Sequence, residues 1–391
     1  MLKDLKGGGC LSIGTAFCQV VSILILPWTM QNYTPGEFGL YSLLMILTSL
    51  LSAIFTFNSE VLVFSKESKL HSIKIINGNI KRCILIAACL LCVVLIFGRY
   101  FEYQNYWLVL PFAALVQSVF FNLYYLNNKF GLFARMAVMS VISSLCTSIL
   151  PNVVPIYGVI SLYLSFVFGL FISILLNFRF VFFVIKKFRC KYKFEKIGFY
   201  VFLQNSLDQA SSAVVLSFIG TGYGTAMLGY YALATRLLSA PLKFISSSFS
   251  QVYAREMSEK KSLILFNKFS NLMVFFSVVA YCGVNLILVY GDGFIPEGWK
   301  DVSKIVLILT IGYSIRFIAS ALSHTPIIYM KLKFNTKLAI LGVGISMLVV
   351  LVSVWMNYHF NTMLTILSAW YLLYYFGCFK WYRLVVERNE R

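Results

Sequence analysis

GYGTAMLGYYALATRLLSAPLKFISSSFSQVY, residues 222–253, is apolar for most of its length and long enough to cross a bilayer. Two cations, Arg236 and Lys243, nevertheless lie well inside it. A cation at bilayer depth costs at least about 2.5–3.5 kcal/mol, so such a residue is expected to face the interior of a helix bundle or water. Seven residues are roughly two helical turns, which places both cations on one face, about 10 Å apart along the axis.

Pro241 lies between these cations and has no amide hydrogen to donate within a helix. The helix is therefore predicted to bend near Pro241 and to leave a carbonyl near Leu237 without its usual partner. A bent apolar helix with two cations on one face is predicted to meet an anion inside a membrane.

The composition is that of a membrane protein with several spans. Of 391 residues, 60% are hydrophobic and only 12% are charged, whereas a soluble domain carries about 25% charged residues. The first apolar run, residues 10–30, is as long as a span and has no small-residue cleavage site after it, so we expect no removable signal peptide. The nine cysteines are scattered, and the Cys89–Cys92 pair has no second pair near it. We expect the cysteines to serve packing, and we expect no metal and no cofactor.

Apolar windows of about 20 residues predict an all-α integral membrane fold with twelve transmembrane helices. The predicted spans are 9–30, 38–63, 83–101, 106–126, 136–156, 158–184, 198–219, 226–253, 267–290, 303–325, 338–357 and 363–384. Two six-helix halves follow, residues 1–190 and 191–391. Every predicted outward loop is short, so all chemistry is expected in the membrane or at its faces.

The basic residues alternate between the two sides of this topology. Counted together with the adjoining span ends, the N-terminus, the even-numbered loops and the C-terminal end hold 27 of the 33 lysines and arginines. The odd-numbered loops, counted in the same way, hold only Arg99, Lys300 and Lys304. The positive-inside rule therefore predicts that both termini are cytoplasmic. The basic loops 185–196 and 66–82 are interpreted as topology signals at an anionic leaflet, and no nucleic-acid partner is expected.

A short internal repeat connects the two halves. Gly39-Leu40-Tyr41-Ser42-Leu43 opens the second span, and Gly229-Tyr230-Tyr231-Ala232-Leu233 opens the eighth, 190 residues later. Both copies follow an outward loop and lie six spans apart, so the halves have the same orientation. This is the parallel type of repeat found in some transporters.

Other polar groups inside the spans are candidates for function. Asp208, in the seventh span, is the only carboxylate deep in the second half, and Arg236 or Lys243 is its natural partner. Arg316 lies in the tenth span, and Glu60 ends the second. The three cations predict a positive cavity in the second half; alternatively, they neutralise acids and hold helices together. Asp208 is either a structural counter-ion or a proton or sodium site, and Glu60 is either interfacial or functional.

Two stretches resemble polysaccharide flippases of the O-antigen type, which belong to the multidrug/oligosaccharidyl-lipid/polysaccharide (MOP) exporter superfamily. One is Ile25-Leu26-Pro27 followed by YTPGEFGLYSL at 33–43, and the other is GYYALATRLLSAP at 229–241 followed by SQVYARE at 250–256. The similar topology covers the whole chain, whereas the motifs cover about 45 residues. The first half departs from the family pattern because Gln31 and Asn58 stand where arginines are common.

The resemblance implies a V-shaped pair of six-helix lobes that alternate between inward-open and outward-open states. It implies an undecaprenyl-pyrophosphate-linked oligosaccharide as substrate, moved across the bacterial inner membrane. Arg236, Lys243 and Arg316 would then contact the pyrophosphate or the sugars while the lipid tail stays in the bilayer. Membrane lipids, a proton or sodium ion and other glycan-assembly membrane proteins are further partners to expect, and a monomer suffices.

Two other functions remain open from the sequence. A drug or metabolite antiporter of the same superfamily would favour acids in its cavity, whereas this chain has three cations and one aspartate there. A membrane enzyme such as a glycan polymerase or transferase is disfavoured because no large outward loop is present. In addition, His71, His324 and His359 have no carboxylate placed for acid–base catalysis.

The coupling role of Asp208 leads to a first prediction. Asp208→Asn should lower transport in a manner that depends on pH or sodium, because the amide can neither bind a proton nor attract a cation as the carboxylate does. Transport is measured at several pH values and sodium concentrations. Full activity with no dependence on either condition would exclude coupling through this residue.

Overall fold

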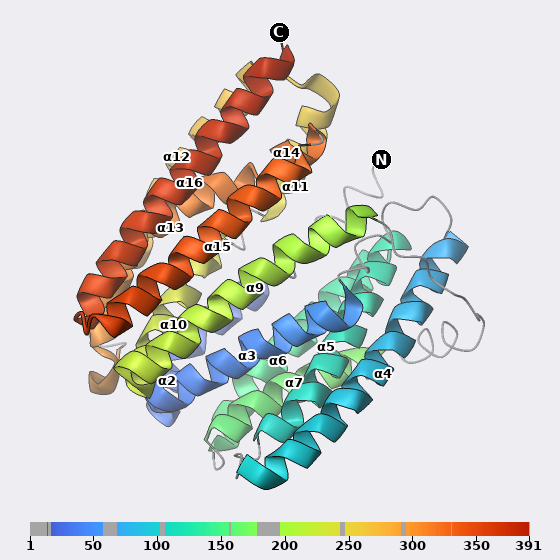
Figure 1. Ribbon diagram of the computed structural model, residues 1–391, viewed down its shortest axis with the longest axis vertical. Helices are drawn as coiled ribbons and strands as arrows, with labels where there is room; N and C mark the ends of the chain where they lie inside the picture. Colours follow the sequence, from blue (N-terminus) through green and yellow to red (C-terminus); the bar gives the residue numbers. More distant parts are fainter. Residues whose placement is uncertain are drawn as a thin grey trace. The chain divides into compact units, whose positions relative to one another are not determined.

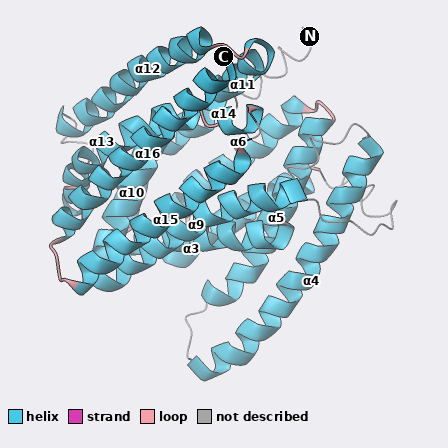
Figure 2. Cartoon of the chain, turned by 45° about the horizontal axis from the view of Figure 1, so that its top comes forward, coloured by secondary structure: helices cyan, strands magenta, loops and turns pink. Residues whose placement is uncertain are grey.

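The computed structural model describes residues 14, 17–57, 69–101, 106–155, 158–177, 196–242, 247–290, 295–329 and 331–390. Within these ranges the chain is helical and has no strand, as Figure 2 shows. The helices are α2 (Leu26–Asn32), α3 (Pro35–Thr56), α4 (Lys69–Phe101), α5 (Tyr106–Lys129), α6 (Phe133–Val153), α7 (Val159–Leu175), α9 (Lys196–Tyr223), α10 (Thr225–Pro241), α11 (Ser247–Lys260), α12 (Leu263–Tyr290), the 3-10 helix η4 (Glu297–Trp299), α13 (Asp301–Ala321), α14 (Thr325–Ile328), α15 (Leu332–Trp355) and α16 (Phe360–Glu390).

The predicted fold class is confirmed. Each of the twelve predicted spans overlaps helix within the described ranges. Eight helical segments are long and apolar enough to cross a membrane by length and composition. The helices α7 and α10 have 17 residues each and fall just short of that length.

The chain divides into two compact units, and each is described by itself. Unit 1 comprises residues 1–32 and 41–213, and unit 2 comprises residues 33–40 and 214–391. The first turns of α3 thus belong to unit 2, and the rest of α3 belongs to unit 1. The predicted boundary between residues 190 and 191 lies outside the described ranges, so the division into halves there stays a prediction.

The segment 66–82 was expected to be a loop, and this expectation is wrong from residue 69 onward, because α4 begins at Lys69. The first turns of α4 are amphipathic. Ile73, Ile76 and Ile80 are almost fully buried and pack with Leu126 of α5. Burying these side chains stabilises the helix. Lysines and polar residues in the same segment had suggested a loop.

Unit 1 also contains buried polar side chains that satisfy one another and carry no charge. The amide of Asn79 donates to the side-chain oxygen of Asn122 over 3.2 Å, and both residues are fully buried. The hydroxyls of Thr48 and Tyr163 lie 2.6 Å apart. Buried polar groups that are hydrogen-bonded avoid most of the cost of leaving water.

In unit 2, α13, α15 and α16 pack side by side, as Figure 1 shows in orange and red. At Gly312 of α13 an added Cβ would lie 3.0 Å from the carbonyl oxygen of Ser368 in α16. The Ser368 hydroxyl donates to the Ile308 carbonyl over 2.7 Å. At Gly342 of α15 an added Cβ would lie 2.5 Å from the Tyr374 ring of α16. Small residues at these points let the helices approach closely.

The start of α4 provides a prediction about stability. Ile76 is fully buried, so Ile76→Ala should lower the free energy of unfolding by about 2–5 kcal/mol through lost contacts and a cavity. Leu85 on the same helix is 66% exposed, and Leu85→Ala should change stability much less. Both are measured by thermal unfolding of the purified protein in detergent. Equal effects would contradict the packing of the α4 start.

Candidate functional site

The two copies of the internal repeat meet in space. The helices α3 and α10 begin at Pro35 and Thr225, which are 190 residues apart like the motifs themselves. A Cβ added to Gly39 would lie 2.7 Å from the backbone nitrogen of Gly229 and 3.0 Å from the carbonyl oxygen of Thr225. A Cβ added to Gly229 would overlap the carbonyl of Pro35. Each glycine therefore faces the first residue of the other helix, as expected for two equivalent elements related by a local two-fold axis.

Phe38, Tyr230 and Trp299 form an aromatic cluster beside this crossing. The ring of Phe38 lies 5.8 Å from that of Trp299 at an interplanar angle of 83°. The ring of Tyr230 lies 6.0 Å from that of Trp299, and its hydroxyl donates to the Gly298 carbonyl over 2.9 Å. Edge-to-face rings of this kind stabilise a buried contact beyond the area that they bury. The cluster therefore attaches η4 to the starts of α3 and α10.

Arg236 lies two turns beyond Gly229 on α10. Its guanidinium carbon is 5.9 Å from the centre of the Phe38 ring. The residue is half-buried, and within the described ranges it has no ion pair. A ring attracts a cation through its quadrupole without neutralising it. The charge of Arg236 is therefore held in place and is not cancelled by any acid among the described residues.

Helix α10 ends at Pro241, and the amide of Leu242 donates to the Ser239 carbonyl. Residues 243–246 lie outside the described ranges, so the bend expected at Pro241 stays a prediction. The Tyr281 hydroxyl of α12 donates to the Leu238 carbonyl over 3.1 Å. Lys243 lies outside the described residues, and its role stays a prediction.

Arg316 of α13 is also held by aromatic rings. Its guanidinium carbon is 5.3 Å from the centre of the Tyr313 ring and 5.7 Å from that of the Tyr375 ring. The Tyr313 and Tyr371 rings meet at 6.4 Å, and the Tyr371 hydroxyl is hydrogen-bonded to that of Tyr231 on α10. Tyrosines from α10, α13 and α16 thus connect the helix that carries Arg236 with the helix that carries Arg316. Both predicted arginines belong to unit 2.

The predicted acids are placed differently. Asp208 is exposed and lies in the part of α9 that belongs to unit 1, whereas Arg236 belongs to unit 2. The Ser212 hydroxyl donates to the main-chain carbonyl of Asp208, not to its carboxylate. Glu60 lies outside the described residues. The pairing of Asp208 with Arg236 or Lys243 stays a prediction.

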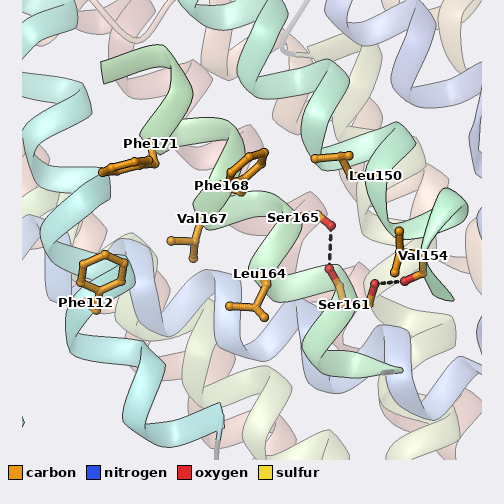
Figure 3. Close-up of a pocket in the computed structure, with 9 residues that line it drawn as sticks. All are labelled: Phe112, Leu150, Val154, Ser161, Leu164, Ser165, Val167, Phe168 and Phe171. Atoms are coloured by element: carbon orange, nitrogen blue, oxygen red, sulfur yellow. Dashed lines mark hydrogen bonds between the residues drawn. The ribbon is translucent and has the colours of Figure 1, made fainter. Parts of the chain in front are cut away.

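A pocket of about 480 Å³ in unit 1 is apolar throughout (Figure 3). It is lined by Phe112, Leu150, Val154, Ser161, Leu164, Ser165, Val167, Phe168 and Phe171. The two hydroxyls there donate to the carbonyls of Val154 and Ser161. This pocket offers no free polar group to a charged head group, whereas the candidate cations Arg236 and Arg316 lie in unit 2. Over the described part of the chain no group of His, Cys, Asp and Glu side chains could hold a metal ion.

A family model described as polysaccharide biosynthesis protein matches residues 33–296, which is more than half of the chain. The chain belongs to this polysaccharide biosynthesis protein family. The matched region contains the glycine crossing, Phe38, Tyr230 and Arg236, and it ends just before Trp299. Arg316 also lies beyond it.

Solved structures show that this polysaccharide biosynthesis protein has the MOP transporter fold. A MOP superfamily transporter from Pyrococcus furiosus matches with a TM-score of 0.66 at 11% identity, over 99% of this chain and 97% of that one. The lipid II flippase MurJ, in an inward closed conformation, matches with a TM-score of 0.66 at 19% identity, over 96% and 90%. An inward-facing multidrug transporter of the MATE family matches with a TM-score of 0.65 at 10% identity, over 97% and 99%. No curated protein sequence matches the chain.

The chain is therefore a member of the polysaccharide biosynthesis protein family that has the fold of MOP superfamily transporters, as the motifs indicated. Sequence reasoning selected Arg236 and Arg316 but missed the aromatic side chains that hold them. Phe38 could have been found, because it precedes the repeat glycine as Leu228 precedes Gly229. The tyrosines around Arg316 carry no such signal, since aromatic residues occur throughout the chain.

The crossing gives a prediction. Gly229→Ala should lower the stability by about 1–3 kcal/mol and reduce transport, because the new methyl group overlaps the Pro35 carbonyl. Gly344→Ala is the matched control, because Gly344 is exposed on α15 and has no atom within 4 Å of an added Cβ. Thermal unfolding and transport are measured for both variants. A Gly229→Ala protein as stable and active as Gly344→Ala would show that the helices do not meet at this glycine.

Proposed function

We propose that this protein is a flippase that moves an undecaprenyl-pyrophosphate-linked oligosaccharide from the cytoplasmic to the periplasmic leaflet of the bacterial inner membrane by alternating access. The supporting observation is the placement of Arg236, a cation inside an apolar helix that contacts a phenyl ring and has no ion pair within the described ranges. A charge kept in such a place without an acid is available to an anionic substrate.

The physical task of a flippase explains this arrangement. A sugar-pyrophosphate head that crosses hydrocarbon unaided loses the hydration of every phosphate charge and hydroxyl, at a prohibitive free-energy cost. Arg236, Lys243 and Arg316 would replace part of that hydration with charge-assisted hydrogen bonds. The lipid tail needs no such help and would remain in the bilayer. Asp208 and Glu60 would serve a proton or sodium ion or act as counter-ions.

The α3 helix suits alternating access because it begins in unit 2, at the glycine crossing, and continues in unit 1 from Tyr41. A close backbone contact can act as a pivot, since a crossing without side chains leaves few rotamers to rearrange. In hinged transporters, packed bundles move as bodies about a few such points. The proposal includes a non-enzymatic cycle with both termini in the cytoplasm, which agrees with the alternation of basic residues.

The alternative of a multidrug or metabolite antiporter shares the fold but not the charge. Carriers of organic cations need acids in the cavity, whereas the described spans of unit 2 place arginines among aromatic rings. Similarity to MATE structures at 10–12% identity shows the fold alone. The lipid-linked glycan is therefore the better supported substrate.

Deletion of the gene in its host separates these functions. We expect loss of surface glycan together with build-up of the lipid-linked unit in the cytoplasmic leaflet, detected by leaflet-specific lectin or enzyme access to inverted vesicles. Loss of a polymerase would instead leave single-unit product outside. Intact surface glycan together with a change in drug sensitivity would favour the antiporter.

Complementation of the deletion strain tests the anion site. Arg236→Ala should abolish surface glycan while the protein is still expressed, and Arg236→Lys should restore part of it, because the ammonium keeps the charge but loses the planar guanidinium. Lys243→Ala is expected to behave like Arg236→Ala. Lys304→Ala is the matched control, because Lys304 is exposed and paired with Asp301 over 3.5 Å. Full complementation by both alanine variants at positions 236 and 243 would exclude these residues from substrate binding.

A further inference from the structure

The ends of α15 and α16 furthest from their short connection carry a group of basic residues. The six described ones are Lys331, Lys333, Lys337, Lys380, Arg383 and Arg388. The positive-inside rule assigns this end to the cytoplasmic face. Within the described ranges the four lysines have no ion pair, whereas the lysines at the opposite end, Lys300 and Lys304, are paired with Glu297 and Asp301.

The acids at this end face other partners. Glu387 is paired with Arg383 over 2.9 Å. Burial raises the pKa of the Tyr329 hydroxyl, and the negative charge of Glu390 raises it further, so Glu390 lies near the residue that follows α14. These placements leave Lys333, Lys337 and Lys380 without a neighbouring carboxylate of their own in the described structure.

An aromatic contact fixes the two helices at this point. The rings of Phe334 on α15 and Trp381 on α16 are 4.8 Å apart. Each is adjacent in sequence to a lysine, Lys333 in one case and Lys380 in the other. Lys337 lies three residues from Phe334 and therefore on the same face of α15. The lysines thus flank an aromatic pair of the kind that occupies the headgroup region of a bilayer.

Lys380, one of the basic residues at this end, contacts an aromatic ring of its own helix. Its ammonium lies 4.8 Å from the centre of the Phe376 ring, one turn back along α16, and Phe376 is 44% exposed among other apolar residues. A lysine near a span end usually extends away from hydrocarbon toward water. The ammonium of Lys380 instead lies over the Phe376 ring, toward the apolar part of α16.

We propose that Lys333, Lys337 and Lys380, arranged around the Phe334–Trp381 pair, bind the head group of an anionic phospholipid in the cytoplasmic leaflet. The lysines meet the phosphate and any second anionic group, and the aromatic rings hold the glycerol region against the seam between α15 and α16. Basic pockets between transmembrane helices on the cytoplasmic side are suited to such head groups. The site is separate from Arg236 and Arg316 and does not depend on which substrate the protein transports.

The test titrates the purified full-length protein in a neutral detergent with phosphatidylglycerol and, separately, with phosphatidylcholine, and counts bound lipids by native mass spectrometry. The wild type should bind phosphatidylglycerol in preference to phosphatidylcholine, and added salt should weaken this binding. The K333Q/K337Q/K380Q variant should bind phosphatidylglycerol about a hundredfold more weakly, since each cation near an anionic surface contributes about fivefold.

The K300Q/K304Q variant removes two exposed lysines at the opposite end and should keep the wild-type affinity. Thermal unfolding shows whether each variant is folded; if the triple variant is not, K380Q alone should lower the affinity about fivefold. Unchanged phosphatidylglycerol binding in the folded lysine variants, equal loss in K300Q/K304Q, or equal affinity for phosphatidylcholine would overturn the proposal. Because the measurement involves no transport, its failure would leave the proposed function untouched.

Discussion

The contact between Gly39 and Gly229 is the constraint on which the rest of the candidate site depends. Two helix starts approach so closely that each added Cβ would meet the other backbone. Only glycine permits this, because every other residue carries a carbon where the partner's backbone lies. The same approach brings the Phe38 ring of one helix start against Arg236 of the other helix, and the Phe38 ring also contacts Trp299. The two copies of the internal repeat therefore also form a contact surface with each other.

The way in which the arginines are held has a consequence for function. A buried ion pair would stabilise the cation but would cancel the field that attracts a phosphate. A phenyl or phenol ring contributes about 0.5–2 kcal/mol and leaves the positive charge in place. Arg236 on Phe38 follows the second solution within the described ranges, and Arg316 also lies against rings, those of Tyr313 and Tyr375. These ring contacts do not compete with an anion for hydrogen bonds, since a ring face accepts none of the usual kind.

The sequence predicted the helices well because hydrophobic length is a strong signal in a membrane, where every backbone group must be bonded within its own segment. It failed at residues 69–82, where lysines suggested a loop although isoleucines at helical spacing pack on Leu126. It selected Arg236 and Arg316 from the cost of burying charge alone. It could not identify their aromatic partners, because those arise from long-range packing that no local pattern encodes.

The two units differ in how they hold polar groups, and this difference bears on where recognition occurs. The described interior of unit 1 contains amides and hydroxyls that bond one another, such as Asn79 with Asn122. These neutral groups have no charge to offer, although in the described structure the buried side-chain oxygens of Gln117 and Asn127 have no hydrogen-bond partner. The arginines in described spans that have aromatic partners and lie deep in helices, Arg236 and Arg316, both belong to unit 2. In the proposed function, the anion is met by the cations of the second half. Gln31 and Asn58 stand where related flippases commonly carry arginines, so in that proposal the first half leaves the phosphates to Arg236, Lys243 and Arg316.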